Sequence, residues 1–270
     1  MKVASFPKFA FFLPVAVIFV LALAGCGGSN NLGLTQGNWA FSATSTTAAS
    51  AISSTAFVLG GNLTQSGTSL TGTMYVTQSG CIAPQFVNFT GTVKDKNISL
   101  TSETFGGQVI TVAASGTKDS LTGTYTVTGE CADSGTVSAN AVPSISGTWN
   151  GTISNISGSK GFGVAQATVS VALTQAATPS EDGTFAMSGT LTYTNSICSV
   201  SGTIANGSLA GNYIVFINGT TLDTDDGAGE FSYDGITLDS VTAPKNMAGD
   251  YSVTGGLCQG QFQSLTLTKQ

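Results

Sequence analysis

The sequence has no histidine, and its eight basic residues, all lysines, face 14 acidic residues for a formal charge of −6. Charged residues make up 8% of the chain, whereas about a quarter is usual for a soluble domain. Without a basic stripe to neutralise phosphates, the composition argues against nucleic-acid binding. Without histidine, the chain lacks the commonest general base and the commonest metal ligand. We therefore expect no catalytic residues, no cofactor and no metal.

Long apolar runs are scarce as well. The longest, AFFLPVAVIFVLALA at residues 10–24, has 15 uncharged residues, whereas a membrane-spanning helix needs roughly 20. Lys2 and Lys8 precede it and small residues follow it, which is the pattern of a secretory signal. The sequence therefore predicts that residues 1–25 are a cleaved signal helix of an exported protein.

The apolar run ends in Leu23-Ala24-Gly25-Cys26, which resembles the lipobox of bacterial lipoproteins. The resemblance implies that the Cys26 thiol receives a diacylglyceryl group, that the chain is cut before it, and that the new amino terminus is acylated. Two or three acyl chains give stable anchoring, so the implied partner is a membrane and the implied location is the cell envelope. Gly27 stands where many lipoproteins kept at the inner membrane have Asp, which implies the outer membrane in a bacterium with two membranes. The alternative is an ordinary signal peptide with a chance cysteine.

Cysteine is sparse, with five residues in the chain. If lipid takes Cys26, four remain, and an even number in an exported protein favours disulfides. No Cys-x-x-Cys occurs and no histidine is present, so a redox or metal pair lacks support. Four cysteines allow three pairings. The four are Cys81, Cys131, Cys198 and Cys258.

An internal repeat chooses among these pairings. Three short segments recur in the same order, with offsets that need only loop-sized insertions, so the chain holds two copies of one domain. Each copy contains two cysteines at corresponding places, which predicts Cys81–Cys131 and Cys198–Cys258 disulfides. The recurring segments are GNW at 37–39 with GTW at 147–149, LTQ at 63–65 and 173–175, and GTYTVTG at 123–129 with GDYSVTG at 249–255.

The repeat also sets the domain boundaries. After the signal peptide we expect a lipidated tether at 26–36 and a first β domain at 37–142. A linker follows at 143–146, where Pro143 stands. The second β domain, a repeat of the first, spans 147–270.

Side-chain alternation predicts strands. In residues 121–128 every even position is Thr, while Leu121, Gly123, Tyr125 and Val127 hold the odd positions. A period of two indicates a half-buried strand. The fold class is therefore all-β, with two tandem antiparallel β-barrels or β-sandwiches, and eight strands suit an up-and-down barrel that is filled or holds one small ligand. The first copy has eight such segments: 39–45, 56–64, 70–77, 86–93, 97–102, 109–114, 121–128 and 136–141.

The Gly-x-Trp that opens each copy resembles the start of the first lipocalin strand, and LTGTY at 121–125 is similar to hairpins of avidin-like barrels. This calycin-type resemblance implies a barrel and carries over no ligand. In lipocalins an Arg packs on the Trp, and this chain has no Arg. We expect Trp39 and Trp149 to pack in the floor of each barrel.

Carboxylates offer two further hypotheses. Acidic residues are densest at 223–234, where oxygen ligands could hold calcium, but the EF-hand spacing is not met, which favours a solvated loop. The other hypothesis is a hydrolase that uses carboxylates alone. Its candidates, with no pair selected among them, are Glu103, Glu130, Asp133 and the acidic stretch.

The function that these observations favour is a non-catalytic, lipid-anchored binding or surface module, so we expect no enzyme. Its partners would be a small apolar ligand inside a barrel or an unknown partner at the cell envelope or surface. The alternative is a structural or adhesive component of the envelope that uses the two domains as spacers. A barrel interior filled by side chains would favour the spacer, and an open apolar cavity would favour ligand binding.

Overall fold

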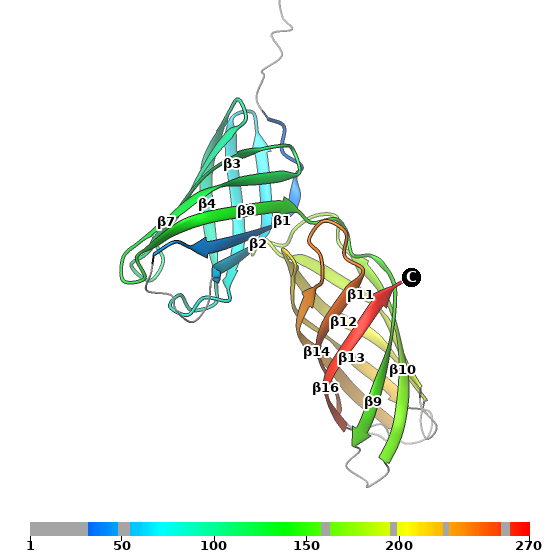
Figure 1. The fold of residues 1–270 in the computed structure, drawn as a ribbon. Coiled ribbons are helices and arrows are strands. Elements are labelled where there is room, and N and C mark those ends of the chain that lie inside the picture. The colour runs from blue at the N-terminus through cyan, green and yellow to red at the C-terminus, as the bar shows by residue number, and fades with distance from the viewer. Residues whose placement is uncertain (1–31, 48–54, 158–162, 195–198, 224–226, 255–259) are drawn as a thin grey trace, which may run out of the picture. The chain divides into compact units, whose positions relative to one another are not determined.

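The computed structural model describes residues 32–47, 55–157, 163–194, 199–223, 227–254 and 260–270. Within these ranges every helix or strand assigned is a β-strand, and 16 strands form two closed barrels (Figure 1). The all-β prediction is thus confirmed, and the barrel is the form that the fold takes. Across the described ranges no helix has the length and apolar character needed to cross a bilayer. The expected signal helix and Cys26 lie outside the described residues.

The first barrel has up-and-down topology. Each strand pairs antiparallel with the next, and β8 returns to pair with β1. The eight predicted segments match these strands to within three residues at either end. The strands are β1 (Gly37–Ser45), β2 (Thr55–Ser66), β3 (Ser69–Thr77), β4 (Gln85–Lys94), β5 (Asn97–Ser102), β6 (Val109–Gly116), β7 (Ser120–Thr128) and β8 (Asp133–Ala141).

The second barrel repeats this order, with β16 closing onto β9. Its strands are β9 (Gly147–Ser157), β10 (Gly163–Gln175), β11 (Phe185–Thr194), β12 (Ser199–Ala210), β13 (Tyr213–Asp223), β14 (Gly227–Leu238), β15 (Asn246–Thr254) and β16 (Gly260–Lys269).

The two barrels share one pairing register. In the first, Trp39 of β1 lies opposite Gly61 of β2, and Gly61 lies opposite Met74 of β3. In the second, Trp149 lies opposite Val171, and Val171 lies opposite Leu191. A one-residue slip in either copy would turn its apolar side chains outward. The same apolar alternation therefore specifies the same barrel twice.

The interior of the first barrel is filled by its own side chains. Trp39, Met74, Val76, Val87 and Ile110 each have an exposed fraction of 0%. A water-sized sphere therefore does not reach them, as expected where eight strands close around side chains of this size. Burial of these apolar groups is the main term that stabilises the barrel.

One of the two predicted disulfides is confirmed. Cys81 follows β3 and Cys131 follows β7, and the two are bonded with their Cα atoms 5.8 Å apart. The bond joins two connections at the rim of the first barrel. The predicted Cys198–Cys258 pair lies outside the described residues.

Candidate functional site

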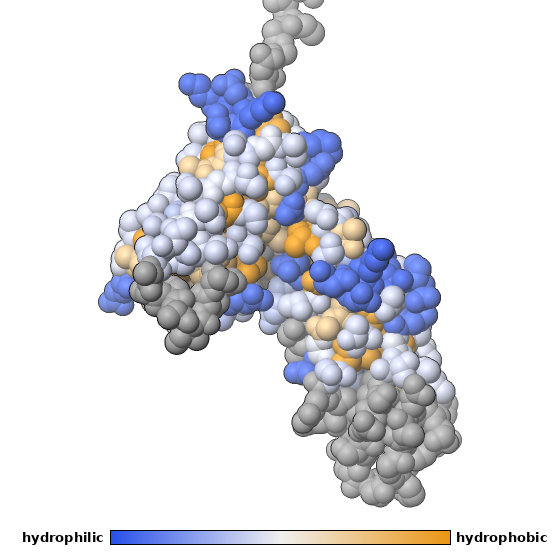
Figure 2. Space-filling view, viewed as in Figure 1, coloured by the Kyte–Doolittle hydropathy of each residue, from blue (hydrophilic) through white to orange (hydrophobic). Residues whose placement is uncertain are grey.

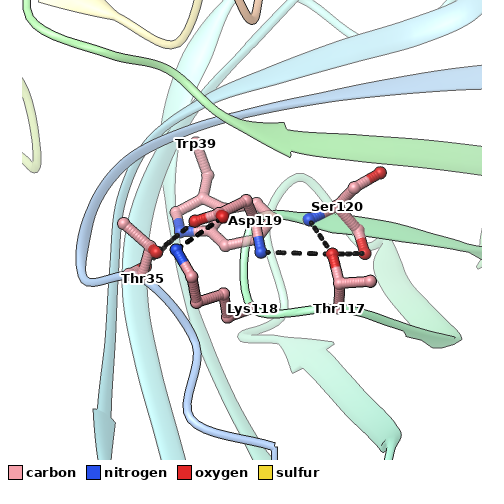
Figure 3. Close-up of polar contacts among 6 residues, drawn as sticks. All are labelled: Thr35, Trp39, Thr117, Lys118, Asp119 and Ser120. Atoms are coloured by element: carbon pink, nitrogen blue, oxygen red, sulfur yellow. Dashed lines mark hydrogen bonds and ion pairs between the residues drawn. The ribbon is translucent and has the colours of Figure 1, made fainter.

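One end of the first barrel is closed by residues that the sequence assigned to the tether (Figure 3). The Trp39 indole Nε1 donates to the Thr35 carbonyl at 2.7 Å, and the Leu34 amide donates to Gln65 Oε1 at 2.8 Å. The Thr35 hydroxyl donates to the Asp119 carboxylate, in the connection between β6 and β7. Leu34 is buried against the core. The chain just before β1 is therefore part of the barrel.

The second barrel is closed in the same way by residues expected in the linker. Trp149 Nε1 donates to the Ile145 carbonyl at 2.9 Å, and the Ile145 amide donates to Gln175 Oε1 at 3.0 Å. Lys269 Nζ, from the last strand, lies 5.4 Å from the centroid of the Trp149 ring. Trp39 and Trp149 are both fully buried, which confirms that they pack inside their barrels.

The carboxylate of Asp119, at this closed end, has hydrogen-bonding partners close by. Asp119 accepts hydrogen bonds from the Lys118 ammonium, with 2.6 Å between Nζ and Oδ2, and from the Thr35 hydroxyl. These contacts lower the pKa of the Asp119 carboxyl below its usual value. The arrangement holds the tether segment to the β6–β7 connection.

A second carboxylate, Asp133, occupies the start of β8. Its Oδ2 accepts from the Tyr125 hydroxyl at 2.6 Å, and its Oδ1 accepts from Ser45 Oγ at 2.7 Å and from the Thr47 hydroxyl. Burial alone would raise the pKa of Asp133, but these hydrogen bonds lower it below its usual value. Burial, and then the neighbouring Asp133, raise the pKa of the Tyr125 hydroxyl. Asp133 thus ties β1, β7 and β8 together.

The candidate carboxylates of a hydrolase have separate partners. Glu103, just after β5, accepts from the Asn88 amide and the Asn88 side chain at 3.1 Å each. Asp133 is engaged by hydroxyl groups of other strands, and Glu130 is exposed in the turn after β7. These contacts give Glu103 and Asp133 structural roles.

The acidic stretch at 223–234 differs from the solvated loop that its composition favours. Asp223 ends β13 and Gly227 begins β14, so the connection is confined to residues 224–226, which lie outside the described residues. Glu230 and Asp234 belong to β14, where Asp234 lies opposite Asp250 of β15. The chain continues hydrogen-bonded strands through positions that the sequence assigned to a loop. In the described part of the chain, no three His, Cys, Asp or Glu side chains group as a metal site would require.

Because its interior is filled by apolar side chains, the first barrel presents its polar side chains on its outer face. Six threonines lie directly opposite one another on six consecutive strands, from β2 to β7, as a belt of hydroxyl groups. Much of the visible surface is correspondingly pale in hydropathy (Figure 2). The belt consists of Thr64, Thr71, Thr90, Thr101, Thr111 and Thr126.

The second barrel has a depression of about 460 Å³ on the outer face of β9, β10 and β11. Its polar lining is six exposed side chains, none of them ionisable, and Gly151 and Val169 complete it. The size lies within the range of small-molecule sites. The polar lining residues are Asn150, Thr152, Thr168, Ser170, Thr192 and Thr194.

Sequence reasoning did not find this depression. Thr and Ser are frequent on every outward face, so composition does not single out these six positions. The signal that was present is the difference between the two copies: where the second copy has Asn150 and Ser170, the first has Ala40 and Gly60.

No family model matches the chain, and no curated protein matches it. Among solved structures, a protein of unknown function from the DUF3598 family of Nostoc punctiforme is 11% identical. The match covers 88% of this chain and 94% of that one, with a TM-score of 0.21. A likeness of this size carries no argument about function.

Proposed function

We propose that the protein is an exported bacterial lipoprotein, held at the cell envelope by acyl chains on Cys26, and that it acts there as a non-catalytic structural or surface component. The Leu23-Ala24-Gly25-Cys26 segment supports the anchor. The observation that carries the role is the filled interior of the first barrel, where Trp39, Met74 and Val87 are fully buried. A filled barrel makes its contacts through its outer face.

The filled interior favours this role over the carriage of a small apolar ligand. Lipid-binding barrels keep an apolar cavity open, and such a cavity buries most of the ligand's surface. In the second barrel the side chains of Val169, Leu191, Tyr193 and Tyr251 are buried as well, at 1–2% exposure. An apolar ligand would have to displace these side chains, at the cost of their packing.

The anchor is tested by metabolic labelling with an alkyne palmitate analogue in a bacterial host that processes lipoproteins. We expect label on the wild-type chain, which should remain with the membrane fraction. The Cys26→Ser variant should be unlabelled, and a Gly27→Ala variant is the matched control that should still be labelled. Labelling that persists in Cys26→Ser, or a wild-type chain without label, would overturn the lipoprotein assignment.

The role is tested separately on the chain from residue 27 onward, which retains every described residue. A fluorescent fatty-acid analogue should show no saturable binding, because the interior of the first barrel is filled and the described inward side chains of the second are buried. Saturable binding that is lost on enlarging an inward residue, as in Val76→Phe, would instead establish an internal ligand site and contradict the proposal.

A further inference from the structure

The depression on β9–β11 is an ordered grid. Thr152, Thr168 and Thr194 lie directly opposite one another on the three strands and form one row. Asn150, Ser170 and Thr192 form the neighbouring row. Neighbours within a row are about 4.8 Å apart and the rows are about 6.8 Å apart, as strand geometry requires. A ligand laid across the strands would thus meet a polar group at each step.

The chemistry of the grid selects a neutral ligand. None of the residues that line the depression carries an ionisable side chain, so a charged ligand would find no counter-charge in the lining. Hydroxyl groups both donate and accept hydrogen bonds, and the Asn150 amide does the same through separate atoms. The ligand that answers this pattern is one dense in hydroxyl groups and free of charge.

The duplicated barrel provides an internal comparison. In the first barrel the corresponding rows are Ser42, Val58 and Thr77, and Ala40, Gly60 and Tyr75, paired in the same register. The aliphatic side chains and the glycine there provide no side-chain hydrogen-bonding group. Since both copies close the same barrel, closure does not require six polar groups at these positions. The six polar groups therefore occur together in the second copy and not in the first, where Ala40 is also buried.

We propose that the depression on β9–β11 is a binding site for a neutral oligosaccharide, whose hydroxyl groups exchange hydrogen bonds with the two rows. The open shape across three strands suits a segment of a longer sugar chain. The proposal rests on the proposed function in one respect, that the outer faces make the protein's contacts. It gives that surface role a ligand class and a place.

The experiment is an NMR titration of the chain from residue 27 onward with three probes: the hexasaccharides of β-1,4-glucose, α-1,4-glucose and β-1,4-N-acetylglucosamine. We expect at least one probe to cause saturable shifts of the backbone amides of Gly151, Val169 and Thr192. The double variant Asn150→Ala/Thr168→Val carries the residues of the first barrel. It should raise the Kd about tenfold or more, since each lost hydrogen bond is worth a factor of several.

The matched control is Thr90→Val/Thr101→Val, which removes two exposed hydroxyl groups from the threonine belt of the first barrel and should leave the Kd unchanged. Thermal melting of each variant, followed by circular dichroism, confirms that both barrels remain folded. The proposal is overturned if none of the probes gives saturable shifts, if the shifts map elsewhere, or if the control weakens binding as much as the double variant. None of these outcomes bears on palmitate labelling, so the anchor stands or falls separately.

Discussion

Single residues at the rim of the first barrel stabilise the fold through contacts of a kind that also occur in enzyme active sites. Asp133 is a partly buried carboxylate with three hydroxyl donors, an arrangement that could orient a catalytic acid. Its donors come from β1, from the connection after it and from β7, so the effect is to pin strand ends. Both carboxylate oxygens of Asp133 thus accept hydrogen bonds from neighbouring elements.

Replacement of Asp133 by Asn should lower the free energy of unfolding at neutral pH by about 1–3 kcal/mol, because charge-assisted hydrogen bonds are lost. The folded-state pKa is lowered, so the carboxylate contributes its full stability above the unfolded pKa of about 4 and loses it as the pH falls through the folded pKa. Urea unfolding of wild type and variant across this range should show the gap closing in acid. Glu130→Gln, in the neighbouring turn, is the control, and a gap that is independent of pH would contradict the mechanism.

Gly123 in β7 is one of the glycines whose identity is fixed by close contact with the neighbouring strand. A Cβ atom at this position would collide with the carbonyl oxygen of Ala113 and crowd the Cα of Ala114, both on the neighbouring strand β6. Neither atom can move without shifting the ladder. Gly123→Ala should therefore cost about 1–3 kcal/mol or more, as overpacking does.

The measurement for Gly123→Ala is the midpoint of urea unfolding. Gly80→Ala is its control, because a Cβ atom at Gly80 meets nothing within 4 Å. If the two variants were equally stable, the close approach of β6 and β7 would not be a constraint.

For individual residues, the sequence predicts well whether a side chain points into the barrel, and it predicts poorly which residue that side chain contacts. The alternation in β7 identifies Leu121, Tyr125 and Val127 as inward, and all three are buried. The bond between Leu34 and Gln65 spans 31 positions and depends on one amide meeting one side chain, for which the sequence has no periodic signal. Burial leaves a periodic pattern over many residues of a strand, whereas a single hydrogen bond of this kind depends on two residues only.

Among the strands and their connections, the Cys81–Cys131 disulfide is the clearest stabilising feature. It joins the β3–β4 connection to the β7–β8 turn across 50 positions. A disulfide that closes a loop of this length restricts the unfolded chain. In the chain-entropy model this restriction stabilises the folded state by about 4 kcal/mol. The first barrel should depend on the bond, because a domain of this size has a modest core.

The variant Cys81→Ala/Cys131→Ala should therefore unfold at a clearly lower urea concentration, with a loss of up to about 4 kcal/mol. Trp39 fluorescence in a Trp149→Phe background isolates the transition of the first barrel. The same double replacement in the presence of a reducing agent should show no further loss for this barrel. A variant as stable as the parent would mean that the bond adds nothing to folding.

Strand order was predictable because consecutive alternating segments are joined by connections of at most nine residues, some as short as the turn between Ser66 and Ser69. The boundary at β8 was missed by three residues, since Asp133, Ser134 and Gly135 read as turn residues and yet continue the strand. All three residues pair with β7, and Gly135 also lies opposite Ser45 of β1. Propensity is local, and here tertiary pairing overrides it.

For the molecule as a whole, the shortage of charge sets how stability responds to salt. The described residues form a single ion pair, Lys118–Asp119, with side chains 67% and 51% exposed. Such exposed pairs contribute little to stability and are screened by salt. Stability therefore comes from burial.

Raising sodium chloride from about 0.1 M to about 1 M should shift the melting temperature by only a few degrees, since the electrostatic term is small. Sodium sulfate at equal ionic strength should raise it further, because sulfate strengthens apolar burial. Differential scanning calorimetry measures both. A large fall in melting temperature in sodium chloride would show that ion pairs carry more of the stability than burial does.

Ladder closure has one further consequence. Since β1 is hydrogen-bonded to β8, and β16 to β9, a chain enters and leaves each unit along neighbouring strands, with no edge left open to recruit another chain. A gene segment for such a unit can be copied in tandem without cutting any ladder, because the junction falls between complete rings. A protein with this design can lengthen by whole barrels without exposing strand edges that would promote fibre growth. Sequence divergence between the two barrels can then give one of them a function that the other lacks.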